Sequence, residues 1–126
     1  MPAPPFSDQI TFAYVDDAEA AWAFYADVLG LNLIRDQGAC RIYRTAPGAS
    51  IGICRRLPGR PEGAAGVTLT LVTDDIDGWY ARLQAAGVHI ARPLGHSDQF
   101  KVTGFLIEGP EGQRIEIQSF DQPLEN

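Results

Sequence analysis

Two stretches of this chain decide its fold, VDDAEAAWAFYADVLGL at residues 15–31 and VTDDIDGWYARLQAAGV at residues 72–88. Each begins with a valine, which is followed by a tryptophan seven residues later (Trp22, Trp79) and by a glycine fifteen residues later (Gly30, Gly87). The offset between the copies is 57 residues at all three positions. Self-similarity at a fixed offset is typical of an internal repeat, so the chain is predicted to contain two related modules.

Each copy of the repeat has the pattern of one amphipathic helix. In both copies apolar residues recur at spacings of three and four, which places them on one side of a helix. Aspartates at positions 16–17 and 74–75 can cap the two helix N-termini. Gly30 and Gly87 suit the left-handed position that ends a helix. We therefore predict one helix per module, with its apolar side packed on a sheet.

Alternating strands surround both predicted helices. One strand precedes each helix, at 9–15 and 66–72, and three strands follow it, with Pro/Gly turns between the last two. Module one is predicted at 7–56, a Pro/Gly-rich linker at 57–65 and module two at 66–120. The predicted fold class is α+β. Two pseudo-symmetric βαβββ modules form a single domain, residues 1–126, whose cupped mixed sheets enclose a cavity and carry the helices outside.

Composition and charge limit the classes of partner. The chain has 126 residues, a formal net charge of −6 and two cysteines, Cys40 and Cys54. Negative charge disfavours nucleic acid as a partner. The first residues lack the pattern of a signal peptide, and no apolar run approaches the roughly 20 residues of a membrane span. We therefore expect a cytoplasmic protein with reduced thiols and no membrane partner.

The βαβββ repeat, together with AFYADVLGLNL at 23–33 and IEGPEGQRIEI at 107–117, resembles the vicinal oxygen chelate superfamily. This superfamily includes glyoxalase I, extradiol dioxygenases, fosfomycin-resistance enzymes and bleomycin-resistance proteins. The resemblance covers residues 7–120. It implies a fold that hosts metal-dependent lyases, isomerases and oxygenases as well as metal-free binding proteins, so the fold alone does not specify a function.

The resemblance also implies where a metal would be held. In metal-dependent members, four positions related by the internal symmetry carry His, Gln or Glu around a divalent ion. The register of the repeat assigns these positions to Ile10, Gly52, Val67 and Glu116. A single carboxylate is a poor site for a divalent ion, so neither this metal nor another cofactor is expected. Whether His89 or His96 joins a different metal site stays open.

The same register assigns side chains to the predicted cavity. Arg41 and Tyr43 are assigned there because Cys40 and Ile42 are expected to face the helix. Glu116 is the candidate catalytic acid or base, and two other readings stay open, an ion pair with an arginine of the sheet or an anchor for a ligand. The candidate ligand contacts are Phe12, Tyr14, Arg41, Tyr43, Cys54, Leu69, Lys101, Arg114 and Glu116.

These features predict a protein that binds a small, aromatic or hydrophobic organic molecule without a family-type metal, as in resistance by sequestration. The alternative is a lyase or isomerase of glyoxalase type. It would be metal-free with Glu116 as acid/base, or would use an unrecognised divalent metal site. A dimeric interaction module is the second alternative. The resemblance implies a homodimer, in which the Pro-rich residues 1–6 can act as an exchanged arm.

Overall fold

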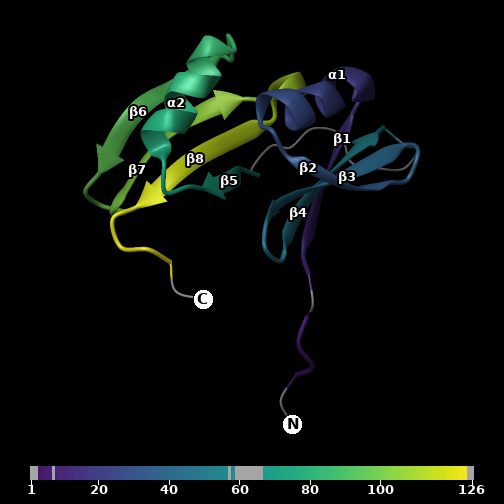
Figure 1. Cartoon of the computed structure of the whole chain (residues 1–126), viewed down its shortest axis with the longest axis horizontal. Helices are drawn as coiled ribbons and strands as arrows, with labels where there is room; N and C mark the ends of the chain where they lie inside the picture. Colours follow the sequence, from purple (N-terminus) through teal and green to yellow (C-terminus); the bar gives the residue numbers. More distant parts are fainter. Residues whose placement is uncertain (1–2, 7, 57, 59–66, 125–126) are drawn as a thin grey trace. The chain divides into compact units, whose positions relative to one another are not determined.

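The computed structural model describes residues 3–6, 8–56, 58 and 67–124 (Figure 1). The chain divides into two compact units, residues 1–63 and 64–126, and each contains one copy of the repeat. The predicted linker at 57–65 lies outside the described residues, apart from Pro58. A core shared by the two modules stays a prediction.

Both units follow the predicted order of one strand, one helix and three strands. The first unit contains β1 (Ile10–Val15), α1 (Ala18–Ala23), the π-helical turn η1 (Phe24–Val28), β2 (Asn32–Asp36), β3 (Cys40–Ala46) and β4 (Ala49–Arg55). The second contains β5 (Leu69–Val72), α2 (Ile76–Ala85), β6 (Ile90–Ser97), β7 (Val102–Glu108), the 3-10 turn η2 (Pro110–Gly112) and β8 (Arg114–Phe120). The predicted α+β class with two βαβββ modules is confirmed.

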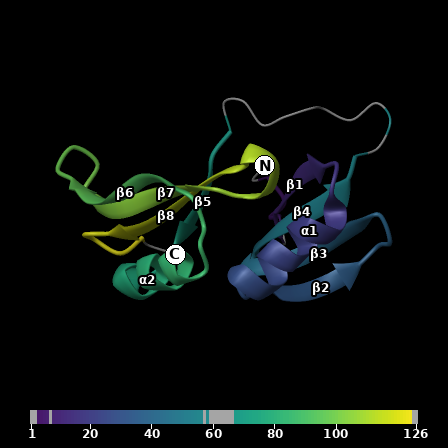
Figure 2. The same ribbon diagram turned by 90° about the horizontal axis from the view of Figure 1, so that it is seen from above.

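Each unit has one mixed, four-stranded sheet. The strand orders are β1-β4-β3-β2 and β5-β8-β7-β6. The first strand of each unit runs parallel to the last, and the remaining pairs are antiparallel. Figure 2 shows α2 along one face of the second sheet. We call the face of each sheet opposite its helix the open face.

The helix ends follow the predicted capping pattern. The Asp17 carboxylate accepts a hydrogen bond from the backbone N–H of Ala20 at 3.1 Å, and Asp75 accepts one from Gly78 at 3.0 Å. Gly30 and Gly87 have φ values of 70° and 75°. Glycine adopts this left-handed conformation without the steric cost of a Cβ. Both helices therefore begin and end where the sequence predicts.

The helical segment of the first unit, α1 together with η1, is one residue longer than α2. Gly30 lies thirteen residues after the cap Asp17, whereas Gly87 lies twelve residues after Asp75. The π-helical turn η1 accommodates the extra residue, because such a turn widens the helix by one residue without breaking it. Equivalent positions are therefore 58 residues apart before this turn and 57 apart after it.

The change of offset corrects the alignment of the two modules. Buried Trp22, whose indole N–H donates to the Ile53 carbonyl at 2.8 Å, is equivalent to Tyr80 and not to Trp79. Tyr80 packs edge-on against Phe105, with their ring centroids 4.8 Å apart. The uniform offset of 57 was wrong for everything that precedes η1, including the first strand of each module.

The corrected alignment exchanges the two faces to which the side chains of β5 were assigned. Thr70 pairs with Glu116, and Leu69 pairs with buried Ile115. Neighbouring residues in adjacent strands share a face. Leu69 therefore lies on the side of the sheet that α2 covers, and its expected placement toward a cavity was wrong.

The faces of β3 were also assigned wrongly. Arg41 and Tyr43 lie on the helix side, where the Arg41 guanidinium stacks 4.3 Å from the centre of the Trp22 ring and Tyr43 stacks on Tyr25. Cation–π contact and aromatic stacking supply the packing that the sequence analysis assigned to aliphatic residues. Ile42 pairs with Gly52 on the open face. Arg41 and Tyr43 thus lose the geometric basis for a role as ligand contacts.

The two cysteines form a disulfide. Cys40 and Cys54 are directly opposite on β3 and β4, with their Cα atoms 4.0 Å apart. Both are buried on the open face of the first sheet. The expectation of reduced thiols was wrong, because strand pairing brings together two residues 14 apart in the sequence. Disulfides are uncommon in cytosolic proteins, so the pairing does not support the expected cytoplasmic location.

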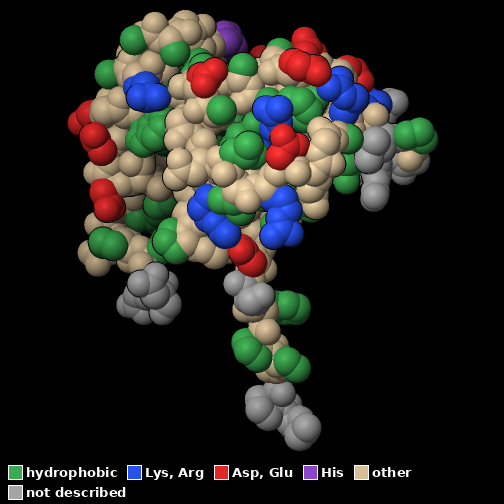
Figure 3. Space-filling view, turned by 45° about the vertical axis from the view of Figure 1, so that its right-hand side comes forward, with side chains coloured by type: hydrophobic (Ala, Val, Ile, Leu, Met, Phe, Trp, Pro, Cys, Tyr) green, Lys and Arg blue, Asp and Glu red, His purple; other side chains and the backbone are tan. Residues whose placement is uncertain are grey.

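Beside the first sheet, the N-terminal residues 3–6 run away from β1 (Figures 1 and 3), and the Phe6 side chain is 98% exposed. Asp8 holds the chain to the sheet, since both of its oxygens accept from Arg44 Nη1 at 3.0 Å. Figure 3 shows acidic and basic side chains interspersed on the face that it displays. None of the described helices has the length and apolar run that crossing a membrane requires.

The disulfide predicts a large effect of reduction on stability. Closing a loop of this length stabilises a fold by about 3 kcal/mol, mainly by restricting the unfolded chain. Chemical denaturation should show that reductant lowers the free energy of unfolding by about this amount. The Cys40→Ala/Cys54→Ala variant should show the same lower value without reductant. The unfolded, unreduced protein should show no reaction with a thiol reagent, and two reactive thiols would contradict the pairing.

Candidate functional site

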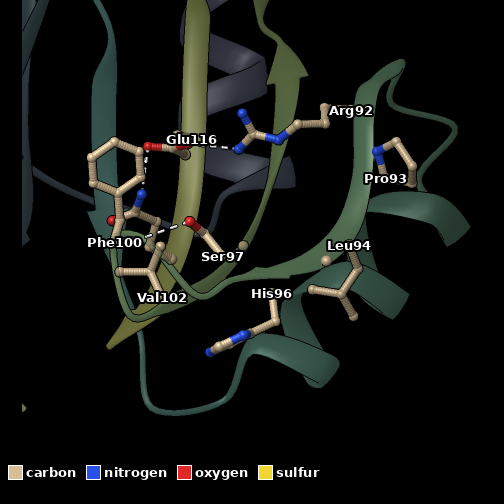
Figure 4. Close-up of a pocket in the computed structure, with 11 residues that line it drawn as sticks. Arg92, Pro93, Leu94, His96, Ser97, Phe100, Val102 and Glu116 are labelled. Carbon is tan, nitrogen blue, oxygen red and sulfur yellow. Dashed lines mark hydrogen bonds and ion pairs between the residues drawn. The ribbon is translucent and has the colours of Figure 1, made fainter. Parts of the chain in front are cut away.

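A pocket of about 700 Å³ lies on the open face of the second sheet (Figure 4). Its residues come from β6, the turn that follows it, β7 and β8. Apolar side chains make up part of the wall, and one carboxylate and one guanidinium supply the charge. The lining residues are Arg92, Pro93, Leu94, Gly95, His96, Ser97, Phe100, Val102, Gly104, Glu116 and Gln118.

The irregular edge strand β6 shapes the wall of this pocket. β6 runs from Ile90 to Ser97 along the edge of the sheet. Pro93 fits here because an edge strand has one side free of ladder hydrogen bonds. The pairing of β6 with β7 shifts register on both sides of Arg92. Such irregularities re-aim side chains, and here Arg92 is paired with Leu106, which brings it to the face of Glu116.

The turn after β6 presents an aromatic ring. The backbone N–H of Phe100 donates to the Ser97 hydroxyl at 3.2 Å, and Lys101 closes the turn with φ of 58°. The Phe100 side chain is 68% exposed. An exposed aromatic ring beside a pocket is available for contact with a bound molecule.

Glu116 lies at the centre of a hydrogen-bond network. Its Oε2 accepts from Arg92 Nη2 at 2.6 Å, and its Oε1 accepts from Gln118 Nε2 at 2.7 Å. The Thr70 hydroxyl lies 3.4 Å from Oε1. The Glu116 side chain is 19% exposed and that of Arg92 is 50% exposed. Glu116 therefore does form the ion pair that the sequence left open, but with Arg92 and not with Arg41 or Arg114.

Of the side chains predicted to contact a ligand, Glu116 is the one that lines this pocket. Lys101 lies beside it in the turn, and Arg114 is exposed on the same strand, two residues before Glu116. Phe12, Tyr14 and Cys54 lie on the open face of the first sheet, where a role in binding stays a prediction.

Sequence reasoning missed Arg92 and Phe100. The alternation along β8 does place Gln118 on the same face as Glu116, and Gln118 lines the pocket. Phe100 is the neighbour of Lys101, which the sequence did assign as a ligand contact. Arg92 carries no periodic signal, because the register shifts that direct it toward Glu116 cannot be read from the sequence.

The four positions inferred for a family metal do not form a donor set. The corrected alignment replaces Val67 by Thr68 as the symmetry mate of Ile10. The ring of Phe12 lies against Gly52, where even a Cβ would overlap it. Ile10 and Gly52 have no ligating atoms, so the set does not fit a divalent ion. The described residues also contain no other cluster of three acidic, His or Cys side chains that could hold a metal.

His96 is engaged by two carboxylates at the end of β6. Its Nε2 lies 2.9 Å from Asp121 Oδ2, and its Nδ1 lies 3.2 Å from Asp98 Oδ1. In Figure 4 its ring points away from the Glu116–Arg92 pair. The hydrogen bond with Asp121, together with the negative charges of both carboxylates, raises the pKa of His96 above its ordinary value.

Comparison with known proteins agrees with this architecture. The family model described as "Glyoxalase/Bleomycin resistance protein/Dioxygenase superfamily" matches residues 8–117. No match was found among curated protein sequences.

Solved structures of similar fold include a lactoylglutathione lyase from Agrobacterium tumefaciens, with 24% identity, a TM-score of 0.71 and coverage of 92% of this chain and 95% of that one. TioX from Micromonospora sp. ML1 has 20% identity, a TM-score of 0.75 and coverage of 90% and 98%. A glyoxalase/bleomycin resistance protein/dioxygenase from Nocardioides has 20% identity, a TM-score of 0.72 and coverage of 99% and 89%. At these identities the similarity establishes the fold.

The surroundings of His96 predict a raised titration midpoint. NMR titration of its ring protons should give a pKa above the ordinary 6.5, and Asp121→Asn should lower it more than Asp98→Asn does. Because the folded-state pKa is raised, the stability that His96 contributes is fully present below pH 6.5 and is lost as pH rises through the raised pKa. A midpoint at or below the ordinary value would contradict the geometry.

Proposed function

Because the chain belongs to the Glyoxalase/Bleomycin resistance protein/Dioxygenase superfamily, we propose that it binds a small, aromatic or hydrophobic organic molecule, as proteins of the sequestering type do. The site is the pocket on the open face of the second sheet. Binding is proposed to need no family-type divalent metal.

The observation that carries this proposal is the composition of the pocket. Its volume of about 700 Å³ is in the range of small-molecule sites. Pro93, Leu94, Phe100 and Val102 supply apolar surface, and the polar groups come from Arg92, His96, Ser97, Glu116 and Gln118. Apolar walls with a few converging polar groups bind an organic molecule by burial and fix its orientation by hydrogen bonds.

The state of Glu116 favours binding over chemistry. A lyase or isomerase without a metal would need this carboxylate to accept a proton from the substrate. Both of its oxygens already accept hydrogen bonds, and the strongest donor is a guanidinium. A substrate would have to displace one of these protein donors before a Glu116 oxygen could accept its proton. The role of Glu116 as a catalytic residue stays a prediction.

Two further features that were predicted from the sequence are retained in the proposal. The homodimer implied by the superfamily resemblance is retained as a prediction, and a monomer at micromolar concentration in sedimentation experiments would overturn it. The cytoplasmic location is likewise retained as a prediction, although a disulfide is more common outside that compartment.

Phe100 gives the direct test of the pocket. N-phenyl-1-naphthylamine, a neutral fluorophore that brightens in apolar surroundings, should bind the native protein. Phe100→Ala should weaken this binding about three- to tenfold through loss of buried apolar area. Phe6→Ala is the matched control, because Phe6 is also an exposed phenylalanine but lies outside the pocket. Equal affinities of the two variants would place the binding site elsewhere.

The metal-free character has its own measurement. The same fluorophore titration should give an unchanged dissociation constant after dialysis against a chelator and after addition of Zn²⁺, Mn²⁺ or Ni²⁺. Elemental analysis of the purified protein should find these metals well below one per chain. Loss of binding on chelation, with recovery on adding one of these ions, would overturn this part of the proposal.

A further inference from the structure

We propose that the pocket on the second sheet selects an aromatic molecule that carries a carboxylate, and that Arg92 binds this group. The inference rests on the proposed function and adds the charge of the ligand. It assigns Arg92 as the residue that determines specificity, with Glu116 as its positioning partner.

The hydrogen-bond inventory of the pocket shows a surplus of donors. Each Glu116 oxygen already accepts a short hydrogen bond, from Arg92 on one side and from Gln118 on the other. A cationic ligand would have to displace these protein donors before it could reach the carboxylate. Within the described residues, Arg92 uses one N–H, to Glu116, out of the five that a guanidinium carries.

Arg92 is placed to use its remaining donors. Half of its side chain is exposed, while the ion pair with Glu116 fixes the orientation of the guanidinium (Figure 4). A planar guanidinium presents two parallel N–H groups that match the two oxygens of a carboxylate. Because the ion pair restricts Arg92 before a ligand arrives, little side-chain entropy is lost on binding. Glu116 thus positions Arg92, although its charge also opposes an incoming anion.

The apolar part of the pocket suits a flat ring. Phe100 and Val102 supply apolar contact, and Gly104 lines the pocket without a side chain. A Cβ at Gly104 would overlap the Ile117 carbonyl oxygen and crowd the Gln118 side chain, so this glycine lets β8 pack closely at the floor of the pocket. Lys101, exposed and next to Phe100, adds a second positive charge near the mouth. An aromatic ring over this surface would hold its carboxylate toward Arg92.

The net charge of −6 by itself favours a cationic ligand, since it attracts cations from a distance. Such long-range attraction is screened beyond about 8 Å at physiological ionic strength. A direct, charge-assisted hydrogen bond inside a partly apolar pocket acts at contact distance and is screened much less. The local donors therefore decide which charge is preferred.

Three probes with one ring system test the inference. 2-Naphthoate is an anion, 2-naphthamide is neutral and 2-naphthylmethylammonium is a cation, so only the charge and its group differ. Titration calorimetry should give an affinity for 2-naphthoate about tenfold or more above that for 2-naphthamide, and lowest affinity for the cation. Arg92→Gln should remove the preference for the anion, and Arg92→Lys should retain part of it. Arg82→Gln, on α2 across the sheet, removes the same charge and should change nothing.

Glu116→Gln gives an opposite sign under the two readings. If Arg92 binds the ligand, Glu116→Gln should strengthen the binding of 2-naphthoate severalfold, because the amide oxygen can still accept from Arg92 while the opposing negative charge is gone. If Glu116 anchors a cation, the same change should weaken the binding of 2-naphthylmethylammonium. The Arg92→Gln/Glu116→Gln variant leaves no unpaired charge, and it should bind 2-naphthoate and 2-naphthamide alike.

The outcomes separate this inference from the proposed function. Equal affinity for the three probes, or a preference for the cation, would overturn the inference while the pocket still binds an aromatic ring. Failure of all three to bind at millimolar concentration would overturn the proposed function, and with it this inference.

Discussion

The parallel pairing of the first and last strands of each unit is the constraint on which the rest of the structure depends. A parallel pair cannot be closed by a tight turn, so a crossover connection must lie between its members, and here it consists of a helix and two further strands. In both units the last strand therefore lies inside the sheet, between the first and the third strand. β4 and β8 are therefore flanked on both sides. Their open-face residues, Gly52 and Glu116, occupy the centre of each sheet.

The sequence predicted well the features that depend on local signals. Alternation along the strands, aspartate caps and glycine helix ends are local signals, and each was borne out where its own residues determine the conformation. Asp17, Asp75, Gly30 and Gly87 all serve as predicted. The strand order within each unit follows from the βαβββ pattern and from the resemblance, because few topologies satisfy both.

The errors in the predicted site residues are of one kind, because each concerns the face of the sheet on which a side chain lies. A shift of one residue reverses every side chain of a strand. The extra helical residue in the first unit moved the alignment of β5 by one, which misplaced Leu69 and Val67. Arg41 and Tyr43 were misassigned because a cation and a phenol ring pack under a helix here, in place of aliphatic groups. The first error comes from an extra residue inside a helix and the second from contacts between residues distant in sequence, and neither is visible in the alternation along a strand.

The pocket illustrates the same limit. Glu116 was identified from its place on the last strand, but its meaning changes with its partner. Arg92 lies 24 residues away on an edge strand of irregular register. Paired with that guanidinium, the carboxylate is an internal counter-ion, and the side chain that remains able to receive a ligand is the cation. Sequence can identify one member of such a pair, while the pairing itself is a property of the fold.

The π-helical turn in the first unit has a consequence for how the two halves of this chain can change. An inserted residue inside a strand would exchange its two surfaces, whereas an inserted residue absorbed in a helix leaves every strand as it was. The repeat has thus kept one scaffold while its open faces have become chemically distinct. One carries a covalent cross-link and an aromatic ring on a glycine, and the other carries a half-exposed ion pair. A duplicated module of this kind lets one surface diverge by substitution without altering the geometry of its twin.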